Sequence, residues 1–150
     1  MELFHASPAI IRQFRPLTHF GSRAAALHRG QAKGARHIYT VAFDPGKQLR
    51  IDDLSAENGA VHSWLKLADL LHYEAKAITQ EDRNAVFAAA GDDQTRSRRA
   101  AGTLARILSQ AGWNSVVYRN QFEDVGSDSF LCLSSSQVRI VEVRPLPRPE

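Results

Sequence analysis

The chain contains 150 residues, of which 43% are hydrophobic and 23% are charged, and this composition excludes an intrinsically disordered chain. Lysine and arginine outnumber aspartate and glutamate by 19 to 16, which gives a formal net charge of +3. This weak excess of positive charge is compatible with a phosphate-bearing ligand or a nucleic acid, and it requires neither.

The cysteine content and the hydropathy exclude further classes. Cys132 is the single cysteine, so an internal disulfide framework is excluded and a thiolate zinc site is not expected. No apolar run approaches the roughly 18 residues of a membrane span, and the first residues lack the basic and apolar regions of a signal peptide. The sequence therefore predicts a soluble, cytoplasmic protein, in the producing cell or in a target cell, without a membrane partner.

The first third of the chain predicts short strands and one helix. Apolar stretches at 2–5, 10–14 and 17–20 are separated by prolines, which restrict them to short or edge strands. Ser22 is a suitable N-cap for a helix over 23–29 that ends at Gly30. Alternating residues predict a strand over 37–43, followed by an Asp-Pro-Gly turn.

The middle of the chain predicts helices. One apolar stripe has helical spacing and consists of Val61, Trp64, Leu65, Ala68 and Leu71. Thr79 and Asp82 resemble a capping box that begins a helix over 80–90, with Gly91 as its end. A further helix is expected over 95–111, and its buried side is expected to contain Ala100, Leu104, Ile107, Leu108 and Ala111. The arginines at 96, 98, 99 and 106 are interpreted as a solvated face rather than a nucleic-acid contact.

The last part of the chain returns to strands, expected over 115–118, 129–133 and 138–143, with an extended tail at 145–150. The order of strands, helices and strands, without repeats or a linker, predicts a single α+β domain over 1–150. The common chemical signatures are missing from the sequence: neither phosphate-binding glycine loop occurs, and no H-E-x-x-H is present. The six histidines show no ligand spacing on a helix, so no metal is predicted.

Three motifs stand out in chain order. Residues 4–8 read Phe-His-Ala-Ser-Pro and residues 18–25 read Thr-His-Phe-Gly-Ser-Arg-Ala-Ala. Residues 112–124 read Gly-Trp-Asn-Ser-Val-Val-Tyr-Arg-Asn-Gln-Phe-Glu-Asp, and they lead to Asp-Ser-Phe-Leu-Cys-Leu at 128–133 and Ser-Gln-Val at 136–138. Together they resemble the ADP-ribosyltransferase superfamily, in its diphtheria-toxin-like and poly-ADP-ribose-polymerase-like branch, and especially its small bacterial and phage-encoded members. The resemblance implies split β-sheets around an NAD cleft with helices to one side.

The resemblance also implies roles for individual residues. His5 would hydrogen-bond a hydroxyl of the nicotinamide ribose, and the backbone of Ala6 would hold the carboxamide. The residues implied to bind NAD are His5, Ala6, Ser7, His19, Phe20, Gly21, Ser22, Asn120 and Ser129. Local structure offers another explanation for some of them, because His5 fits a half-buried strand end and Phe20 fits a core aromatic before a helix cap.

The expected catalytic carboxylate departs from the pattern of that branch. Its strand glutamate corresponds to Ser129, so Glu123, three residues after Asn120, is expected to supply the charge together with His5. Asp124 and Asp128 are the alternative carboxylates, and Glu123 also fits an ordinary surface loop acid. A carboxylate suits this chemistry because cleavage of the nicotinamide–ribose bond builds positive charge on the sugar, as in glycoside cleavage. The nearby cations Arg12, Arg15, Arg23 and Arg119 are candidates for holding the pyrophosphate.

The function implied by the resemblance is a mono-ADP-ribosyltransferase of the toxin or effector type. It would use NAD as its substrate and a protein or a nucleic acid as its acceptor, and an antitoxin or immunity protein is an expected class of partner. Two alternatives stay open at this point. One is a binding module of the same fold that has lost catalysis, and the other is a small basic nuclease that pairs His5 or His19 with Glu123.

Overall fold

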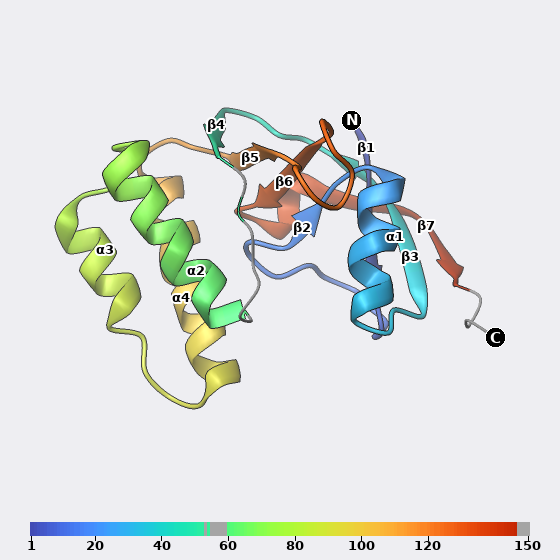
Figure 1. Cartoon of the computed structure of the whole chain (residues 1–150), viewed down its shortest axis with the longest axis horizontal. Coiled ribbons are helices and arrows are strands. Elements are labelled where there is room, and N and C mark those ends of the chain that lie inside the picture. The colour runs from blue at the N-terminus through green and yellow to red at the C-terminus, as the bar shows by residue number, and fades with distance from the viewer. Residues whose placement is uncertain (53, 55–59, 147–150) are drawn as a thin grey trace.

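The structure, a computed structural model, describes residues 1–52, 54 and 60–146, and for residues 60 and 61 it describes the backbone alone. Within these residues the chain forms an α+β fold with two β-sheets and four α-helices (Figure 1). The α+β class predicted from the sequence is confirmed. Pro145 ends the last strand, and residues 147–150 of the predicted tail lie outside the described residues.

One sheet has three strands and joins the two ends of the chain. Its strands are β1 (Glu2–Ser7), β3 (His37–Phe43) and β7 (Val138–Pro145), in the order β1-β3-β7, and both pairs are antiparallel. A register shift between Thr40 and Val41 interrupts the pairing of β3 with β7. Strand β3 has the bounds that its alternating sequence predicts.

The other sheet has four strands in the order β2-β6-β5-β4. They are β2 (His19–Phe20), β6 (Asp128–Cys132), β5 (Ser115–Arg119) and β4 (Gln48–Ile51). The pairs β2–β6 and β5–β6 are antiparallel, whereas β4 and β5 are parallel. A parallel pair needs a long crossover, and here the crossover contains α2, α3 and α4.

These crossover helices pack as a group against the four-stranded sheet. Helix α2 spans Ala60–Asp69 and continues as a π-helical turn over Leu70–Glu74, α3 spans Gln80–Phe87, and α4 spans Asp93–Gln110. Figure 1 shows them together on the left of the molecule. The alternation of β5 builds two cores: Val116 and Tyr118 belong to the cluster shared with these helices, and Val117 belongs to the cluster between the sheets.

Helix α1 (Arg23–Ala32) lies on the other side of the molecule, beside β1 (Figure 1). Ser22 caps it as predicted, since its hydroxyl accepts a hydrogen bond from the Ala25 amide. The predicted end at Gly30 is wrong, because Gly30 is buried inside the helix. A Cβ there would lie 2.6 Å from Cβ of Ala6, so this glycine allows α1 to approach β1 closely rather than ending the helix.

Other boundaries also differ from the prediction. Residues 10–14 form a loop rather than a strand, with Ile10 75% exposed and Phe14 buried between the sheets. The Thr79–Asp82 capping box is present, but its helix ends at Phe87 instead of residue 90. Helix α4 begins at Asp93 because Asp92 caps it, and it ends at Gln110, which leaves Ala111 exposed.

The predicted apolar stripe of α2 is buried at Trp64, Ala68 and Leu71 and half-buried at Leu65. The side chain of Val61 lies outside the described residues. None of the helices that the structure describes combines the length and hydropathy that a membrane span requires.

Candidate functional site

A cavity of about 670 Å³ lies beside the meeting point of the two sheets. The end of β1 and the loop 8–18 form one side of it, and β2 contributes His19. Helix α1 contributes Arg29 and its C-cap residue Lys33, α2 contributes Trp64, and α4 contributes residues 97, 98, 101 and 102. This volume falls within the range of about 300–1,000 Å³ that is common for small-molecule sites.

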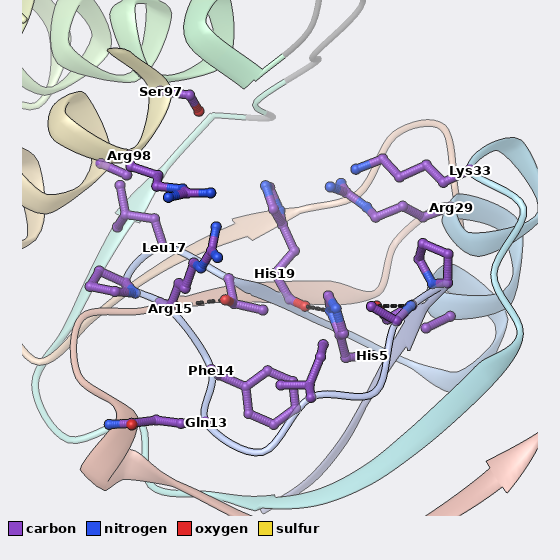
Figure 2. Close-up of a pocket in the computed structure, with 18 of the residues that line it drawn as sticks. His5, Gln13, Phe14, Arg15, Leu17, His19, Arg29, Lys33, Ser97 and Arg98 are labelled. Atoms are coloured by element: carbon purple, nitrogen blue, oxygen red, sulfur yellow. Dashed lines mark hydrogen bonds between the residues drawn. The ribbon is translucent and has the colours of Figure 1, made fainter. Parts of the chain in front are cut away.

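Positive charge dominates the lining of this cavity. Its cations are Arg12, Arg15, Arg29, Lys33 and Arg98, and none of the described residues that line it is acidic. Figure 2 shows Arg15 and Arg98 extending from one side of the His19 ring, and Arg29 and Lys33 extending from the other. Desolvation and the neighbouring charge of Arg29 lower the pKa of Lys33. Among the described residues, Arg29 alone of these cations has a carboxylate partner, Glu123, so the excess of positive charge favours an anionic ligand.

His19 lies between these two pairs of cations. Its ring stacks on Trp64 with 6.0 Å between centroids, and its Nδ1 lies 2.9 Å from the Tyr118 hydroxyl. Desolvation, together with the charges of Arg29 and Lys33, holds the pKa of His19 well below its ordinary value. The imidazole is therefore neutral at pH 7 and adds no charge to the cavity.

His5 is also a neutral imidazole. Its Nδ1 lies 2.8 Å from the carbonyl oxygen of His19 and donates to it, and Phe14 and Phe20 contact its ring. Desolvation lowers the pKa of His5 to about 4. Because Nδ1 carries the proton, Nε2 is an acceptor, suited to a hydroxyl donor such as that of a sugar.

A smaller cavity adjoins the large one. The two share His5, Ala6, His19 and Arg29 in their linings, and the smaller one adds Phe20, Gly21, Glu123 and Ser129 among others. The structure thus brings together His5, Phe20 and Glu123, although more than a hundred residues separate the first from the last. The smaller cavity has a volume of only about 10 Å³, and Glu123 lines it without lining the large cavity.

Glu123 is paired with Arg29. Its Oε1 lies 2.7 Å from Nη2 of Arg29, and its Oε2 accepts from Nε at 3.3 Å. The two side chains are 20% and 18% exposed, and Arg29 also donates to the Tyr118 hydroxyl at 3.3 Å. The arginine that lines both cavities is therefore the residue that holds the predicted carboxylate.

The alternative carboxylates have partners outside the cavities. Asp124 accepts a hydrogen bond from the Ser22 hydroxyl, which ties the loop 120–127 to the beginning of α1. Asp128 forms a bidentate pair with Arg50 at 2.9 and 3.0 Å, and this pair lowers the pKa of Asp128. Neither aspartate lines the large or the small cavity.

Some of the remaining predicted residues line one of the two cavities, and others hold the surrounding structure by hydrogen bonds. Ser7 lines the large cavity, and Gly21 and Ser129 line the small one. A Cβ at Gly21 would lie 2.8 Å from Oγ of Ser129, so a larger residue there would force the Ser129 side chain to move. Asn120 is buried and donates to Ser129 Oγ at 2.5 Å, and Ser22 caps α1, so neither of these two residues lines a cavity.

Sequence reasoning missed several residues of the site. Arg12 and Arg15 line it as expected, but Arg23 does not, and Arg119 lines a different cavity beside β4. Arg98 is exposed, as the interpretation of a solvated face predicts, and it also lines the cavity from α4, which the sequence did not indicate. Arg29 lies in the last turn of α1 and Lys33 is its C-cap residue, and their four-residue spacing was the available signal for two cations on one side of the cavity. Within the described residues, no three His, Cys, Asp or Glu side chains gather as a metal site.

Comparisons with known proteins give little further information. No family model matches the chain, and no curated protein matches it. One similar solved structure is described as a crystal structure of an anti-CRISPR protein. The match covers 97% of this chain and 95% of that chain, with 20% sequence identity and a TM-score of 0.40, which is too low to assign a fold or a function.

The assignment to the ADP-ribosyltransferase superfamily is therefore corrected. No family model supports it, and a solved structure similar to this chain is described as that of an anti-CRISPR protein. The short motifs have local explanations instead: Gly21 packs against Ser129, Ser22 caps a helix, and Gln137 accepts from the Leu133 and Ser134 amides.

Proposed function

We propose that the protein is an enzyme that binds NAD in the large cavity, cleaves the bond between nicotinamide and ribose, and transfers ADP-ribose to a macromolecular acceptor. The single observation that carries the proposal is the junction of the two cavities, where a wall of cations meets one carboxylate and two neutral histidines. In this proposal the cavity beside the two sheets is the NAD cleft.

The cations fit the pyrophosphate of NAD. Arg15, Lys33 and Arg98 have no ion-pair partner among the described residues, so their charges are available to a ligand. Guanidinium groups bind phosphate oxygens through paired hydrogen bonds, and an accessible cavity lets them do so without first breaking an internal contact. The apolar and aromatic parts of the lining, such as Phe14, Leu17 and Trp64, suit the faces of a base.

His5 and Glu123 fit the end of the molecule that reacts. A neutral His5 with Nε2 as an acceptor can take a hydrogen bond from a ribose hydroxyl. Loss of nicotinamide leaves positive charge on the ribose, and the carboxylate of Glu123 would stabilise that charge more in the transition state than in bound NAD. Nicotinamide leaves as a neutral molecule, so the reaction requires no strong general acid.

A specific observation favours a second candidate, a protein that binds NAD and does not cleave it. Arg29 neutralises Glu123, which is the one acid among the described residues that line the small cavity. The nuclease alternative is weaker, because an imidazole with a pKa near 4, such as that of His5, is almost never protonated at pH 7 and cannot serve as a general acid there.

The deciding experiment measures nicotinamide release. The purified protein is incubated with NAD labelled in the adenosine part, with and without whole-cell extract, and the labelled material is treated separately with protease and with nuclease. Release of nicotinamide with transfer of label to protease- or nuclease-sensitive material supports the proposal. Binding of NAD without release supports the second candidate, and RNA cleavage that is indifferent to NAD would contradict both.

A further inference from the structure

Arg29 has a special position, because it lines both cavities and forms an ion pair with Glu123. It lies on α1 one helical turn before Lys33, and the two side chains extend in the same direction in Figure 2. Two cations therefore face one carboxylate at the junction of the cavities. For Lys33, no ion-pair partner is recorded in the part of the chain that the structure describes.

The pairing of Arg29 with Glu123 creates a conflict within the site. A carboxylate bound at both oxygens by a guanidinium has little remaining field to stabilise a developing positive charge. The same guanidinium uses Nε and Nη2, which form its bidentate edge, on Glu123. That edge is also the geometry with which arginine binds phosphate.

We propose that a phosphate group of the ligand binds between Arg29 and Lys33 and takes Arg29 away from Glu123, so that occupation of the anion site releases the carboxylate. This inference rests on the proposed function for the identity of the ligand. It specifies that the group recognised in the ligand is a diphosphate. Arg29 is then a positioning residue that couples binding to the state of Glu123.

The exchange is feasible because of where the groups lie. Both partners are about one-fifth exposed, so the pair is reached from the cavity without unfolding. Lys33 and the more distant Arg15 and Arg98 favour an incoming anion, whereas no acid among the described lining residues of the large cavity opposes it. When Arg29 turns to a phosphate, its positive charge stays in the site and Glu123 regains its own field.

Calorimetric titration with inorganic pyrophosphate tests the exchange, because it needs neither NAD nor turnover. If Glu123 competes for Arg29, Glu123→Gln tightens pyrophosphate binding by about five-fold or more. Asp124→Asn is the matched control, since it removes the same charge from the adjacent residue, whose partner is Ser22, and it should change the affinity by less than about two-fold.

A double-mutant cycle separates exchange from simple electrostatics. In an Arg29→Gln background, where binding is weaker, Glu123→Gln should add less than about two-fold. Arg29→Lys, which keeps the charge and loses the bidentate edge, replaces Arg29→Gln in the cycle if that variant does not fold. Equal effects of Glu123→Gln with and without Arg29, equal effects of the two loop variants, or no binding of pyrophosphate by the wild-type protein would each overturn the inference.

The outcomes for the two proposals are distinct. If the effects of Arg29 and Glu123 on pyrophosphate binding are non-additive but the protein neither binds nor cleaves NAD, the proposed function is contradicted and the exchange at an anion site is supported. If the protein cleaves NAD but the two effects are additive, the proposed function is supported and the exchange is contradicted.

Discussion

Two arginine–carboxylate pairs lie near the strand β6, and they differ in what surrounds them. Arg29 and Glu123 are 18% and 20% exposed and lie where two cavities meet, beside Lys33 and two neutral histidines. Arg50 and Asp128 are 53% and 39% exposed, and they balance each other's charge at the edge of the molecule. The first pair is embedded in an excess of positive charge, and the second is not.

This difference separates a pair beside unpaired cations from a pair beside acids, because the cavity that Arg50 lines also contains Asp52 and Glu74. An exposed pair gains little, because water screens both charges and the ordering of two long side chains opposes the attraction. A half-buried pair beside unmatched cations is polarised by its surroundings, so an anion that enters the cavity changes its energy. Each pair consists of one arginine and one carboxylate, so only their surroundings distinguish them.

The largest expected difference between the pairs is catalytic. Glu123→Gln should lower nicotinamide release at saturating NAD by about 100- to 1,000-fold, because it removes the charge that faces the reacting sugar. Asp128→Asn should change it by less than about three-fold, since Asp128 lines neither cavity of the site. Turnover of the two purified variants measures this. A larger defect in Asp128→Asn would show that the reacting centre lies at the Arg50–Asp128 pair and not at Glu123.

The second difference concerns acid. The folded pKa of His5, about 4, lies below its ordinary value of 6.5, so the unfolded chain binds more protons between these values. Stability that is complete above pH 6.5 is then lost as the pH falls toward 4, by roughly 2 kcal/mol after allowance for partial exposure. In the exposed pair of Arg50 and Asp128, called the outer pair below, the pKa of Asp128 is lowered. The contribution of Asp128 to stability is therefore lost only below about pH 3.8.

Thermal unfolding between pH 7 and pH 4.5 tests this second prediction. The wild-type protein should lose more stability over that range than His5→Gln, which keeps a polar side chain and does not titrate. Asp128→Asn should follow the wild-type curve over the same range. Parallel curves for the wild type and His5→Gln would show that His5 is not held neutral.

The third prediction concerns the binding of NAD by the unpaired cations beside the Arg29–Glu123 pair. Arg98→Ala should weaken NAD binding by about ten-fold, the effect of losing one charged hydrogen bond to the ligand. Arg99→Ala on the same helix is the matched control, because Arg99 donates to the carbonyl of Ala90 and does not line the cavity. Calorimetry with NAD measures both, and similar losses in the two variants would mean that net charge, not the cavity, determines affinity.

The smallest expected effect is that of the Arg50–Asp128 pair on the stability of the protein. Arg50→Gln combined with Asp128→Asn should change the free energy of unfolding by less than about 1 kcal/mol, because the pair is exposed. Chemical denaturation at low and high salt checks this. A larger change that salt removes would show that the outer pair also contributes substantially, which would weaken the contrast.

Local signals were enough to predict much of the fold. The alternation of residues 37–43 predicts β3, and Ser22 and Thr79 predict the beginnings of two helices, because each signal acts within a few residues. The strand predicted at 10–14 is a loop, since Phe14 is buried by tertiary packing between the sheets rather than by strand pairing. Gly30 is read as a helix end by local rules, although its contact with Ala6 decides its role.

The candidate site shows a similar division. Motif order suggests that His5 and Glu123 share a site, and the structure places both against the small cavity, while their roles stay predictions. The spacing of Arg29 and Lys33 was a local signal, but Arg98 could not be predicted as a member, because only the packing of α4 beside the loop 8–18 brings it to the cavity. The family assignment was wrong because its short motifs have other, local reasons to exist in this chain.

The parallel pairing of β4 with β5 has a consequence for how the chain folds. Gln48 pairs with Ser115, and the connection over 52–114 contains the helices α2, α3 and α4, whose contacts with one another are more local. Closing such a long connection costs entropy before any strand contact repays it, and a compact helical group reduces the distance to be closed. We therefore expect the helical group to form before β4 pairs with β5.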